Sequence, residues 1–251
     1  IMASIGTGWL LLLNLFVYKE PAKPESKKSI LEVLKGIVLV LKDYRFVIMI
    51  VIYSMFWILY FQMFDTVLWY LTEHVDMTPV NKAVNSFLSL FTENPGWQFD
   101  PEHVTVLNAG TIIALQLIIS SIVKNFKALP TMIFGIGLGT IGMGILAISM
   151  ESWVFIAGIM IFSIGEMTAH PKFISYVGLI APPDKKALYL GYSFLYGVIG
   201  SGVGGILGAT LYVKFVDGMN RPDLLWLIFT GIGVVAIISM LLYNRFLAPK
   251  R

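Results

Sequence analysis

The sequence predicts an all-α integral membrane protein, and three observations carry this prediction. Apolar residues make up 57% of the 251 residues, charged residues make up 13%, and the mean hydropathy is +0.80. A soluble domain carries roughly 25% charged residues, so this composition excludes a soluble enzyme domain and a disordered chain. Seven stretches approach or exceed the length of about 20 apolar residues that crosses a bilayer as a helix. The loops between these stretches alternate in charge.

The predicted membrane helices cover roughly residues 1–18, 46–72, 104–123, 129–150, 152–180, 187–213 and 223–247. The first stretch lacks a basic start, and no charged residue precedes Lys19, so it does not have the pattern of a signal peptide. We therefore expect residue 1 to lie inside a helix that begins in a preceding part of a longer protein.

The distribution of basic residues predicts the orientation in the membrane. Fourteen of the 18 Lys and Arg residues lie in segments 19–45, 124–127, 184–186 and 245–251. Three lie in the other loops, which carry eight acidic residues. Because cytoplasmic loops are enriched in Lys and Arg, this predicts a multi-pass protein of the cell membrane with segment 19–45 and the C-terminus in the cytoplasm. Loop 73–103 is then outside, and its segment 79–91 predicts a short helix at the interface.

The order of these elements is typical of the major facilitator fold, in which two six-helix halves are joined by a cytoplasmic link. Residues 1–18 are then the last helix of an N-terminal half, 19–45 the cytoplasmic linker, and 46–251 the C-terminal six-helix domain. The expected partners are the lipid bilayer and that N-terminal half. Within the linker, residues 30–45 predict an amphipathic helix on the inner membrane surface. The alternative is that they extend the next membrane helix inward.

Several function classes lack the residues that they require. The chain has no Cys and only three His, and no G-x-S-x-G, H-E-x-x-H or P-loop motif is present. Its basic residues follow the membrane surface without interleaved aromatic residues, which does not indicate nucleic-acid binding. We expect no enzyme activity, no cofactor, no metal site and no nucleic-acid partner.

The predicted 152–180 helix carries the sharpest functional signal. Glu166 lies near its middle, and an acidic residue inside a membrane helix indicates a cavity, an ion pathway or a partner. The alternative is a protonated or paired Glu that holds helices together. His170 follows one turn later on the same face, where it serves either as a proton relay or as a packing residue. Pro171 predicts a break in this helix, and Lys172 is expected to reach inward or to pair with an acid.

The predicted 46–72 helix places Trp57 and Asp65 on one face, with Gln62 beside them. Aromatic residues with one acid and one amide suit a polar organic ligand, whereas an Asp near the outer end of a helix also reaches water. Asn108 begins the 104–123 helix and either lines a pocket or bridges helices. We predict substrate contacts by Glu166, Asn108, Gln62, Trp57 and Asp65, and proton coupling by Glu166, Asp65 and His170.

Glycines cluster in two predicted helices. Gly200, Gly204 and Gly208 recur every four residues, and Gly135, Gly137, Gly139, Gly142 and Gly144 crowd the 129–150 helix. No strand precedes the second cluster, so a dinucleotide-binding loop is excluded. Both clusters predict close helix–helix approach.

Several segments resemble the proton-dependent oligopeptide transporter family. The run Gly165-Glu166-Met167-Thr168-Ala169-His170-Pro171, followed by Ala181-Pro182, is similar to the tenth-helix stretch of that family. Phe56-Trp57 with Gln62 resembles its seventh helix, and Leu107-Asn108 resembles the start of its eighth. The chain departs from the family pattern at Phe61, where an acid is common, at His170, where Ser is common, and after Asn108, where Pro is absent.

The resemblance implies a secondary transporter that carries di- or tripeptides together with protons. Glu166 and Asn108 would hold the amino terminus of the peptide, with Gln62 and Trp57 lining the same cavity. The alternative is a major facilitator transporter of another small solute, such as an amino acid, a drug or a sugar.

Overall fold

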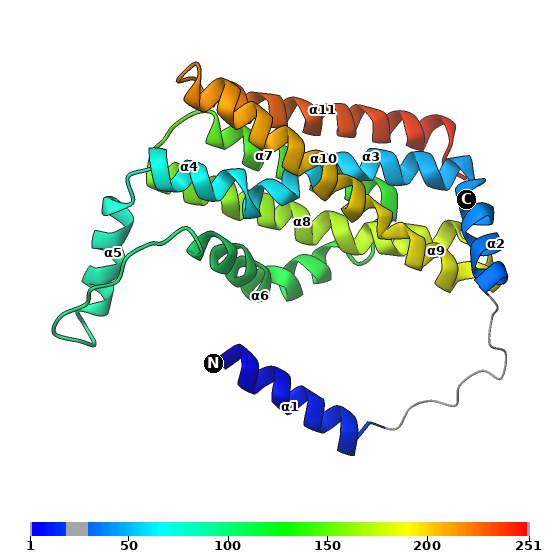
Figure 1. Cartoon of the computed structure of the whole chain (residues 1–251), viewed down its shortest axis with the longest axis horizontal. Helices are drawn as coiled ribbons and strands as arrows, with labels where there is room; N and C mark the ends of the chain where they lie inside the picture. Colours follow the sequence, from blue (N-terminus) through cyan, green and yellow to red (C-terminus); the bar gives the residue numbers. More distant parts are fainter. Residues whose placement is uncertain (1, 19–29, 250–251) are drawn as a thin grey trace. The chain divides into compact units, whose positions relative to one another are not determined.

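A computed structural model describes residues 2–18 and 30–249 of the chain (Figure 1). The chain divides into two compact units, Ile1–Val38 and Leu39–Arg251. The first unit contains α1 (Met2–Phe16) and most of α2 (Ile30–Leu41). Much of the predicted linker, residues 19–29, lies outside the described residues.

Six helices within the described residues are long and apolar enough to cross a membrane. The predicted first stretch forms α1, a shorter apolar helix of 15 residues whose described large side chains are exposed. The predicted amphipathic segment forms α2, which ends at Leu41. Asp43 then caps α3, because its Oδ1 accepts hydrogen bonds from the backbone N–H groups of Arg45 and Phe46, both at 3.2 Å. This cap starts a new helix rather than extending α2.

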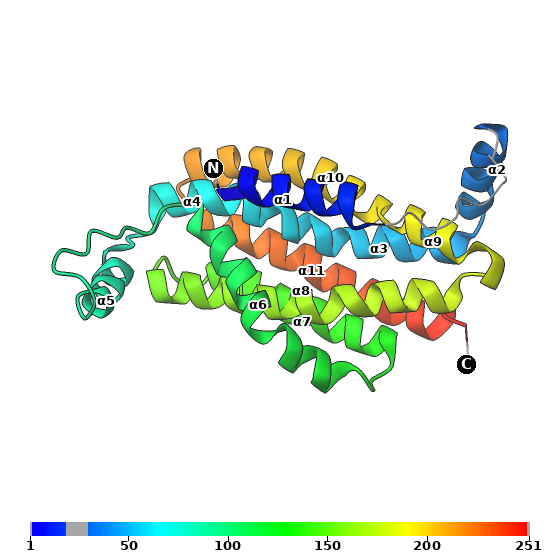
Figure 2. The same ribbon diagram turned by 90° about the horizontal axis from the view of Figure 1, so that it is seen from below.

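The second unit is a bundle of long helices that run side by side along one direction (Figures 1 and 2). Its elements are α3 (Tyr44–Phe61), the 3₁₀ turn η1 (Gln62–Phe64), α4 (Thr66–His74), α5 (Thr78–Leu88), α6 (His103–Val123), α7 (Ala128–Leu146), α8 (Ser152–Ile180), the 3₁₀ turn η2 (Pro183–Lys185), α9 (Lys186–Ser193), α10 (Leu195–Leu211), the π-helical turn η3 (Tyr212–Asp217) and α11 (Pro222–Phe246).

Two helices form the centre of this bundle. α8 packs against α7 and α6, while α3 packs against α10 and α11. α6 buries only Val104, Asn108 and Thr111, and leaves Ile113 80% and Leu117 83% exposed. A helix with so much apolar surface in water would not be stable, so this surface faces lipid or a further protein surface.

The predicted 46–72 span is not one continuous helix. It breaks at Asp65, whose backbone lies at φ −124° and ψ −92° between η1 and α4. The predicted 187–213 span is likewise divided, because α9 ends at Ser193 and α10 begins at Leu195. Broken helices in membranes occur where neighbouring groups satisfy the freed backbone atoms.

The predicted break at Pro171 is wrong. α8 runs through Pro171 as a 29-residue helix. A proline costs an interior helix one hydrogen bond, but helices packed in a membrane tolerate that loss. α8 packs against both α7 and α6, and we attribute the continuity of the helix to this packing.

Glycines bring α7 and α8 into backbone contact, as the glycine cluster predicts. A Cβ added to Gly135 would lie 2.6 Å from the backbone N of Ala169, and one added to Gly142 would lie 2.7 Å from the backbone O of Gly158. On the second cluster, a Cβ at Gly200 would lie 2.6 Å from Trp57 Cβ. Only a hydrogen atom fits at these positions, so the glycines set the distance between the helices.

The segment between α4 and α6 leaves the bundle and returns, with α5 beyond its end (Figure 2). The predicted short helix at 79–91 is confirmed as α5. Asn85 fixes the return segment, because its Nδ2 donates to Trp97 O at 2.8 Å and its Oδ1 accepts from Trp97 N at 2.9 Å. Asn81 Oδ1 likewise accepts from Phe99 N at 2.9 Å.

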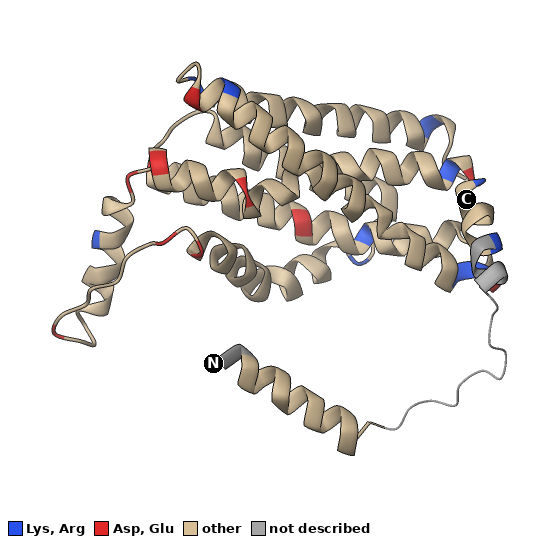
Figure 3. Cartoon of the chain, in the orientation of Figure 1, with Lys and Arg blue, Asp and Glu red and all other residues tan. Residues whose placement is uncertain are grey.

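The charges of this unit separate between its two ends. Figure 3 shows acidic residues concentrated at the end near α4 and α5, and most basic residues toward the opposite end. Two acidic residues lie along the bundle itself, Asp65 and Glu166. This separation matches the unequal distribution of basic and acidic residues between the loops in the sequence. Asp65 and Glu166 are the acidic residues that lie between the two ends.

Candidate functional site

Glu166 is the middle residue of the 29-residue α8. Its Oε2 accepts a hydrogen bond from Asn108 Nδ2 on α6 at 3.1 Å. Asn108 Nδ2 also donates to Ser163 Oγ at 2.9 Å, one turn before Glu166 on α8. Ser163 Oγ in turn donates to the backbone O of Ile159 at 2.9 Å. The structure thus brings together two residues predicted from the sequence, Glu166 and Asn108, through a junction between α6 and α8.

Within the described residues, no Lys, Arg or His forms an ion pair with Glu166. Its only side-chain hydrogen-bond partner there is the neutral amide of Asn108. A carboxylate inside a membrane protein is costly unless it is paired, protonated or in contact with a polar cavity. The half-buried side chain of Glu166 is therefore able to take up a proton or a cationic group of a ligand.

An aromatic group surrounds His170, which lies one turn after Glu166 on α8. It consists of Tyr53 and Trp57 on α3 and Tyr196 on α10. The hydroxyl of Tyr53 lies 3.3 Å from His170 Nδ1, and the Trp57 ring centroid lies 5.5 Å from that of His170. The Tyr196 ring centroid lies 4.6 Å from that of Trp57 and 5.8 Å from that of His170. Three helices thus meet at His170.

The aromatic group continues along α3 away from His170. The Trp57 and Tyr60 rings lie 4.4 Å apart, and Tyr60 lies 6.5 Å from Phe162 on α8. Trp57 and Tyr60 are only partly buried, whereas Tyr53 and Phe162 are fully buried. The partly buried rings of Trp57 and Tyr60 therefore form an aromatic surface on α3, which contacts α8 through Phe162.

Gln62 is placed differently from the other predicted site residues. Its side chain is 0% exposed, and its Nε2 donates to Ile58 O at 2.9 Å and to Gly204 O at 3.1 Å. Its Oε1 accepts from Thr66 Oγ1 at 2.6 Å. The Gln62 amide thus bonds the backbone at the end of α3 and on α10, where Gly204 and Gly208 of α10 lie against it. The amide is therefore not open to a ligand in this conformation.

Asp65 stands at the break between η1 and α4. Its side chain is exposed, and it makes no capping hydrogen bond to α4 although it occupies the N-cap position. The Asp65 carboxylate is therefore available to solvent or a solute. Within the described part of the chain, no hydrogen bond or ion pair joins Asp65 to the Glu166–Asn108 junction.

Lys172 pairs with no acid among the described residues, contrary to one of the two predicted outcomes. It is 9% exposed, and its Nζ donates to the backbone O of Phe126 at 2.8 Å and of Lys124 at 3.3 Å. These carbonyls follow the C-terminal end of α6, where a cation is favoured by the helix dipole. Lys172 thus joins α8 to the end of α6, the helix that carries Asn108.

Three residues of this region were not predicted as site residues from the sequence: Ser163, Tyr53 and Tyr196. Ser163 had a readable signal, since it lies three residues before Glu166 and therefore on the same helix face. Tyr53 stands four residues before Trp57 and had the same kind of signal. Tyr196 had none, because only the tertiary packing of α10 brings it to Trp57.

No protein-family model matches the chain. The chain is 30% identical over 136 residues to an uncharacterized MFS-type transporter, YqjV of Bacillus subtilis (strain 168). It is 27% identical over 123 residues to multidrug resistance protein MdtH of Aeromonas salmonicida (strain A449). The aligned residues cover 52% and 49% of this chain, and about a third of each relative, 31% and 30%.

Solved structures share the fold at low sequence identity. A mutant of the nucleoside transporter NupG matches with a TM-score of 0.64 and 18% identity, over 94% of this chain and 58% of that one. A POT family transporter in complex with 5-aminolevulinic acid matches with a TM-score of 0.58 and 20% identity, over 98% of this chain and 52% of that one. The chain therefore has the all-α membrane fold of the major facilitator type, as the sequence predicts.

Proposed function

We propose that this chain forms one six-helix half of a proton-coupled secondary transporter of the major facilitator type. In this proposal, α1 is the last helix of the other half, and the Glu166–Asn108 junction with the neighbouring aromatic group is one wall of the solute cavity. The protein lies in the cell membrane, with its basic end and C-terminus in the cytoplasm. The large exposed apolar surface of α6 supports a second bundle as its neighbour, because a facilitator cavity forms between two halves.

One observation carries the proposal: Glu166 is a mid-helix carboxylate whose only side-chain partner among the described residues is a neutral amide. A proton and a positively charged solute group compete for such a carboxylate. If protonated and solute-bound Glu166 favour different conformations of the transporter, the two binding events are coupled. Asn108 satisfies either state of the carboxylate, since its amide offers both a donor and an acceptor.

The solute that we propose is a di- or tripeptide. Its charged amino terminus would lie at Glu166 and Asn108, and its side chains would contact Trp57 and Tyr60. Support comes from the resemblance of the residues 165–171 to the oligopeptide transporter pattern and from the likeness in fold to POT family structures. Asp65, exposed at the helix break, is proposed as a second acidic contact.

A second candidate solute is an aromatic organic cation. It is favoured by the relative named as a multidrug resistance protein and by the partly buried Trp57 and Tyr60 beside Glu166. Aromatic faces attract cations within about 6 Å of the ring centroid. The same carboxylate would then bind the cation, and the direction of transport would be outward in exchange for protons.

The decisive experiment is Glu166→Gln in the full-length transporter, reconstituted in liposomes with an imposed pH gradient. This variant keeps the size and hydrogen bonding of the side chain but cannot lose or gain a proton. We expect proton-driven accumulation of an alanyl dipeptide to be abolished while counterflow exchange without a gradient continues. Accumulation at the wild-type pH dependence would refute the proposal.

The two candidate solutes are separated with the wild-type protein. Accumulation of the dipeptide, but not of ethidium or a nucleoside, supports peptide symport. Efflux of ethidium with no dipeptide flux supports the organic cation. For the Glu166→Gln experiment, Gln116→Leu is the control, because Gln116 lies on α6 like Asn108 but its one side-chain hydrogen bond among the described residues goes to Ser120, at 2.8 Å.

A further inference from the structure

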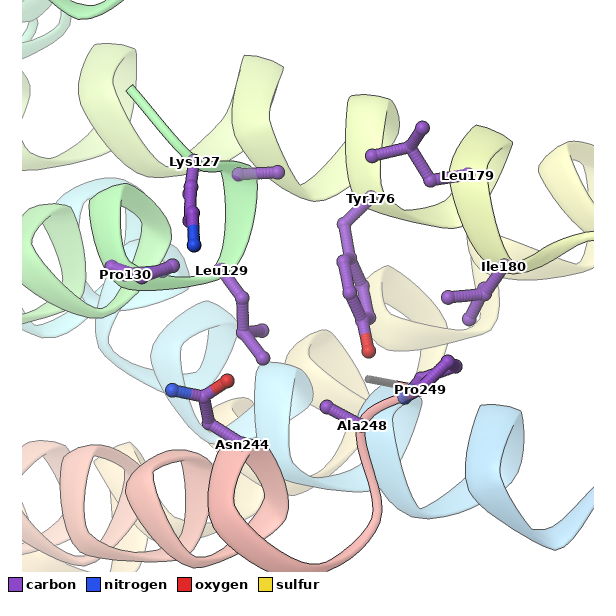
Figure 4. Close-up of a pocket in the computed structure, with 10 residues that line it drawn as sticks. Lys127, Leu129, Pro130, Tyr176, Leu179, Ile180, Asn244, Ala248 and Pro249 are labelled. Carbon is purple, nitrogen blue, oxygen red and sulfur yellow. The ribbon is translucent and has the colours of Figure 1, made fainter. Parts of the chain in front are cut away.

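A pocket separate from the candidate site lies at the basic end of the bundle, between the start of α7, the end of α8 and the end of α11 (Figure 4). Its volume is about 510 Å³, within the range of about 300–1,000 Å³ that holds small-molecule ligands. The lining residues are Lys127, Ala128, Leu129, Pro130, Tyr176, Leu179, Ile180, Asn244, Ala248 and Pro249. None of them belongs to the Glu166–Asn108 junction or to the aromatic group around His170.

The polar groups of this pocket favour an anion. Among the described residues, Lys127 is the only charged residue that lines the pocket, and no carboxylate there pairs with its ammonium group. Lys127 is also the N-cap residue of the 19-residue α7, and its side chain makes no capping hydrogen bond. The first backbone N–H groups of α7, those of Ala128 and Leu129, have no acceptor within the helix. The amide of Asn244 adds a donor from α11. A helix N-terminus beside an unpaired cation attracts negative charge.

The rest of the pocket is apolar. Figure 4 shows Leu179 and Ile180 projecting from α8, Leu129 from α7, and Ala248 and Pro249 from the segment after α11. The surface around it is also apolar, since Leu179 is 51% exposed and Phe126 and Phe246 are 59% and 69% exposed. A water-soluble anion gains nothing from such surroundings, whereas an amphiphile buries its chains there.

A second, smaller cavity adjoins this pocket through Ile180 and Pro249 and brings two more cations, Lys42 and Arg45. Among the described residues, the one acid that lines this cavity is Asp43, and both of its carboxylate oxygens accept hydrogen bonds. Oδ1 caps α3, and Oδ2 accepts a hydrogen bond from Tyr189 at 2.9 Å. The second cavity therefore adds to the positive charge at this end of the bundle.

We propose that the pocket lined by Lys127 binds an anionic phospholipid. The headgroup phosphate lies at the Lys127 ammonium group and the first N–H groups of α7, and an acyl chain lies along Leu129, Leu179 and Ile180. Basic pockets between helices at the cytoplasmic surface are general binding sites for anionic lipid headgroups. This inference does not depend on which solute the protein transports.

The test measures lipid retention by the purified full chain after delipidation, with native mass spectrometry. The probes are palmitoyl-oleoyl phosphatidylglycerol and phosphatidylcholine, which share their acyl chains, and inorganic phosphate. We expect preferential binding of phosphatidylglycerol, reduced about fivefold in Lys127→Gln, as expected for one Lys near an anionic headgroup. Lys124→Gln is the matched control, since Lys124 is an exposed residue of the same loop that does not line the pocket.

A second variant tests the apolar part of the pocket without changing charge. Ala248→Phe places a ring in the cavity, and it is expected to reduce phosphatidylglycerol binding while the thermal unfolding midpoint in detergent stays unchanged. Equal loss in Lys127→Gln and Lys124→Gln would show attraction to surface charge alone and overturn the proposal. Equal retention of the two lipids, or competition by inorganic phosphate at millimolar concentration, would overturn it as well.

Discussion

Asn108 and Glu166 meet across the contact between α6 and α8, with the amide nitrogen 3.1 Å from the carboxylate oxygen. They are 58 residues apart in the chain. Asn108 is one of only three buried residues of α6, so this hydrogen bond is a principal polar link between α6 and the rest of the bundle. Because an amide donates a stronger hydrogen bond to a carboxylate than to a carboxylic acid, protonation of Glu166 is expected to weaken this link between α8 and α6.

Removal of this link is expected to change both solute binding and the pH dependence of transport. In Asn108→Ala, Glu166 loses the hydrogen bond donated by the Asn108 amide, and a hydrogen bond to a charged group contributes about 1.5–3 kcal/mol. We expect solute affinity about tenfold weaker and a shifted pH profile of uptake, measured in liposomes over a series of external pH values. A loss of solute affinity with an unchanged pH profile of uptake would mean that Asn108 binds the solute but has no effect on proton coupling.

Substitution of Asp65 is expected to act on affinity rather than on coupling. Asp65 is exposed at the helix break and makes no capping hydrogen bond, so Asp65→Asn removes a charge without disturbing α4. An exposed charge pair contributes about 0.2–1 kcal/mol, which predicts a KM raised by up to about fivefold with the solute gradient retained. Asp217→Asn, at the end of η3, is the control. Loss of proton-driven accumulation in Asp65→Asn would assign coupling to Asp65.

The glycine seam between α7 and α8 is expected to determine stability position by position. In Gly142→Ala the new methyl group meets the backbone of Gly158 and Phe162 at 2.7 Å, and overpacking of this kind costs about 1–3 kcal/mol. Gly137→Ala is the matched control on the same helix, because nothing lies within 4 Å of its Cβ. The midpoint temperature of thermal unfolding in detergent is expected to fall for Gly142→Ala and to rise slightly for Gly137→Ala. The reverse order would contradict the packing described here.

Lys172 is expected to hold the end of α6 against α8. Lys172→Met keeps the length of the side chain but removes the donors to Lys124 O and Phe126 O, at a cost of roughly 2 kcal/mol. Hydrogen exchange of the 124–127 loop should therefore accelerate. Lys185→Met, at an exposed position of the same end, is the control and should leave that loop unchanged. Unaltered exchange in Lys172→Met would show that other contacts fix the end of α6.

The orientation in the membrane is tested directly because the chain contains no Cys. Single Cys residues in Ser86→Cys, on α5, and Asn125→Cys, between α6 and α7, lie at opposite ends of the bundle. On intact cells, an impermeant maleimide should label Ser86→Cys, whereas Asn125→Cys should react only after permeabilisation. Labelling of both from outside would contradict the predicted cytoplasmic position of the basic end.

Helix positions were largely readable from the sequence because the bilayer allows few solutions. A stretch of about 20 apolar residues has to form a helix there, since every backbone N–H and C=O must be paired internally. The same argument made Glu166 conspicuous, because a carboxylate within such a stretch is rare. The glycine clusters were equally readable, since helices approach closely only where a Cβ is absent.

Helix breaks were not readable in the same way. Proline at 171 was expected to interrupt α8, but packing on both sides keeps the helix continuous. The break at Asp65 has no proline or glycine to mark it, and the polar contacts of Gln62 with α10 accompany it. Breaks of this kind depend on whether neighbouring helices satisfy the freed backbone groups, which no local pattern records.

The sequence by itself determined the class of protein, the helix positions and the candidate carboxylate, because hydropathy and charge act locally along the chain. Only the tertiary structure decided the partners of each side chain. It showed that Asn108 bonds Glu166 and that the Gln62 amide bonds the backbone of Gly204 on α10. It also showed that Tyr196 on α10 contacts Trp57 on α3. Helix rotation and crossing place these groups, and both follow from the packing of whole helix faces rather than from any single motif.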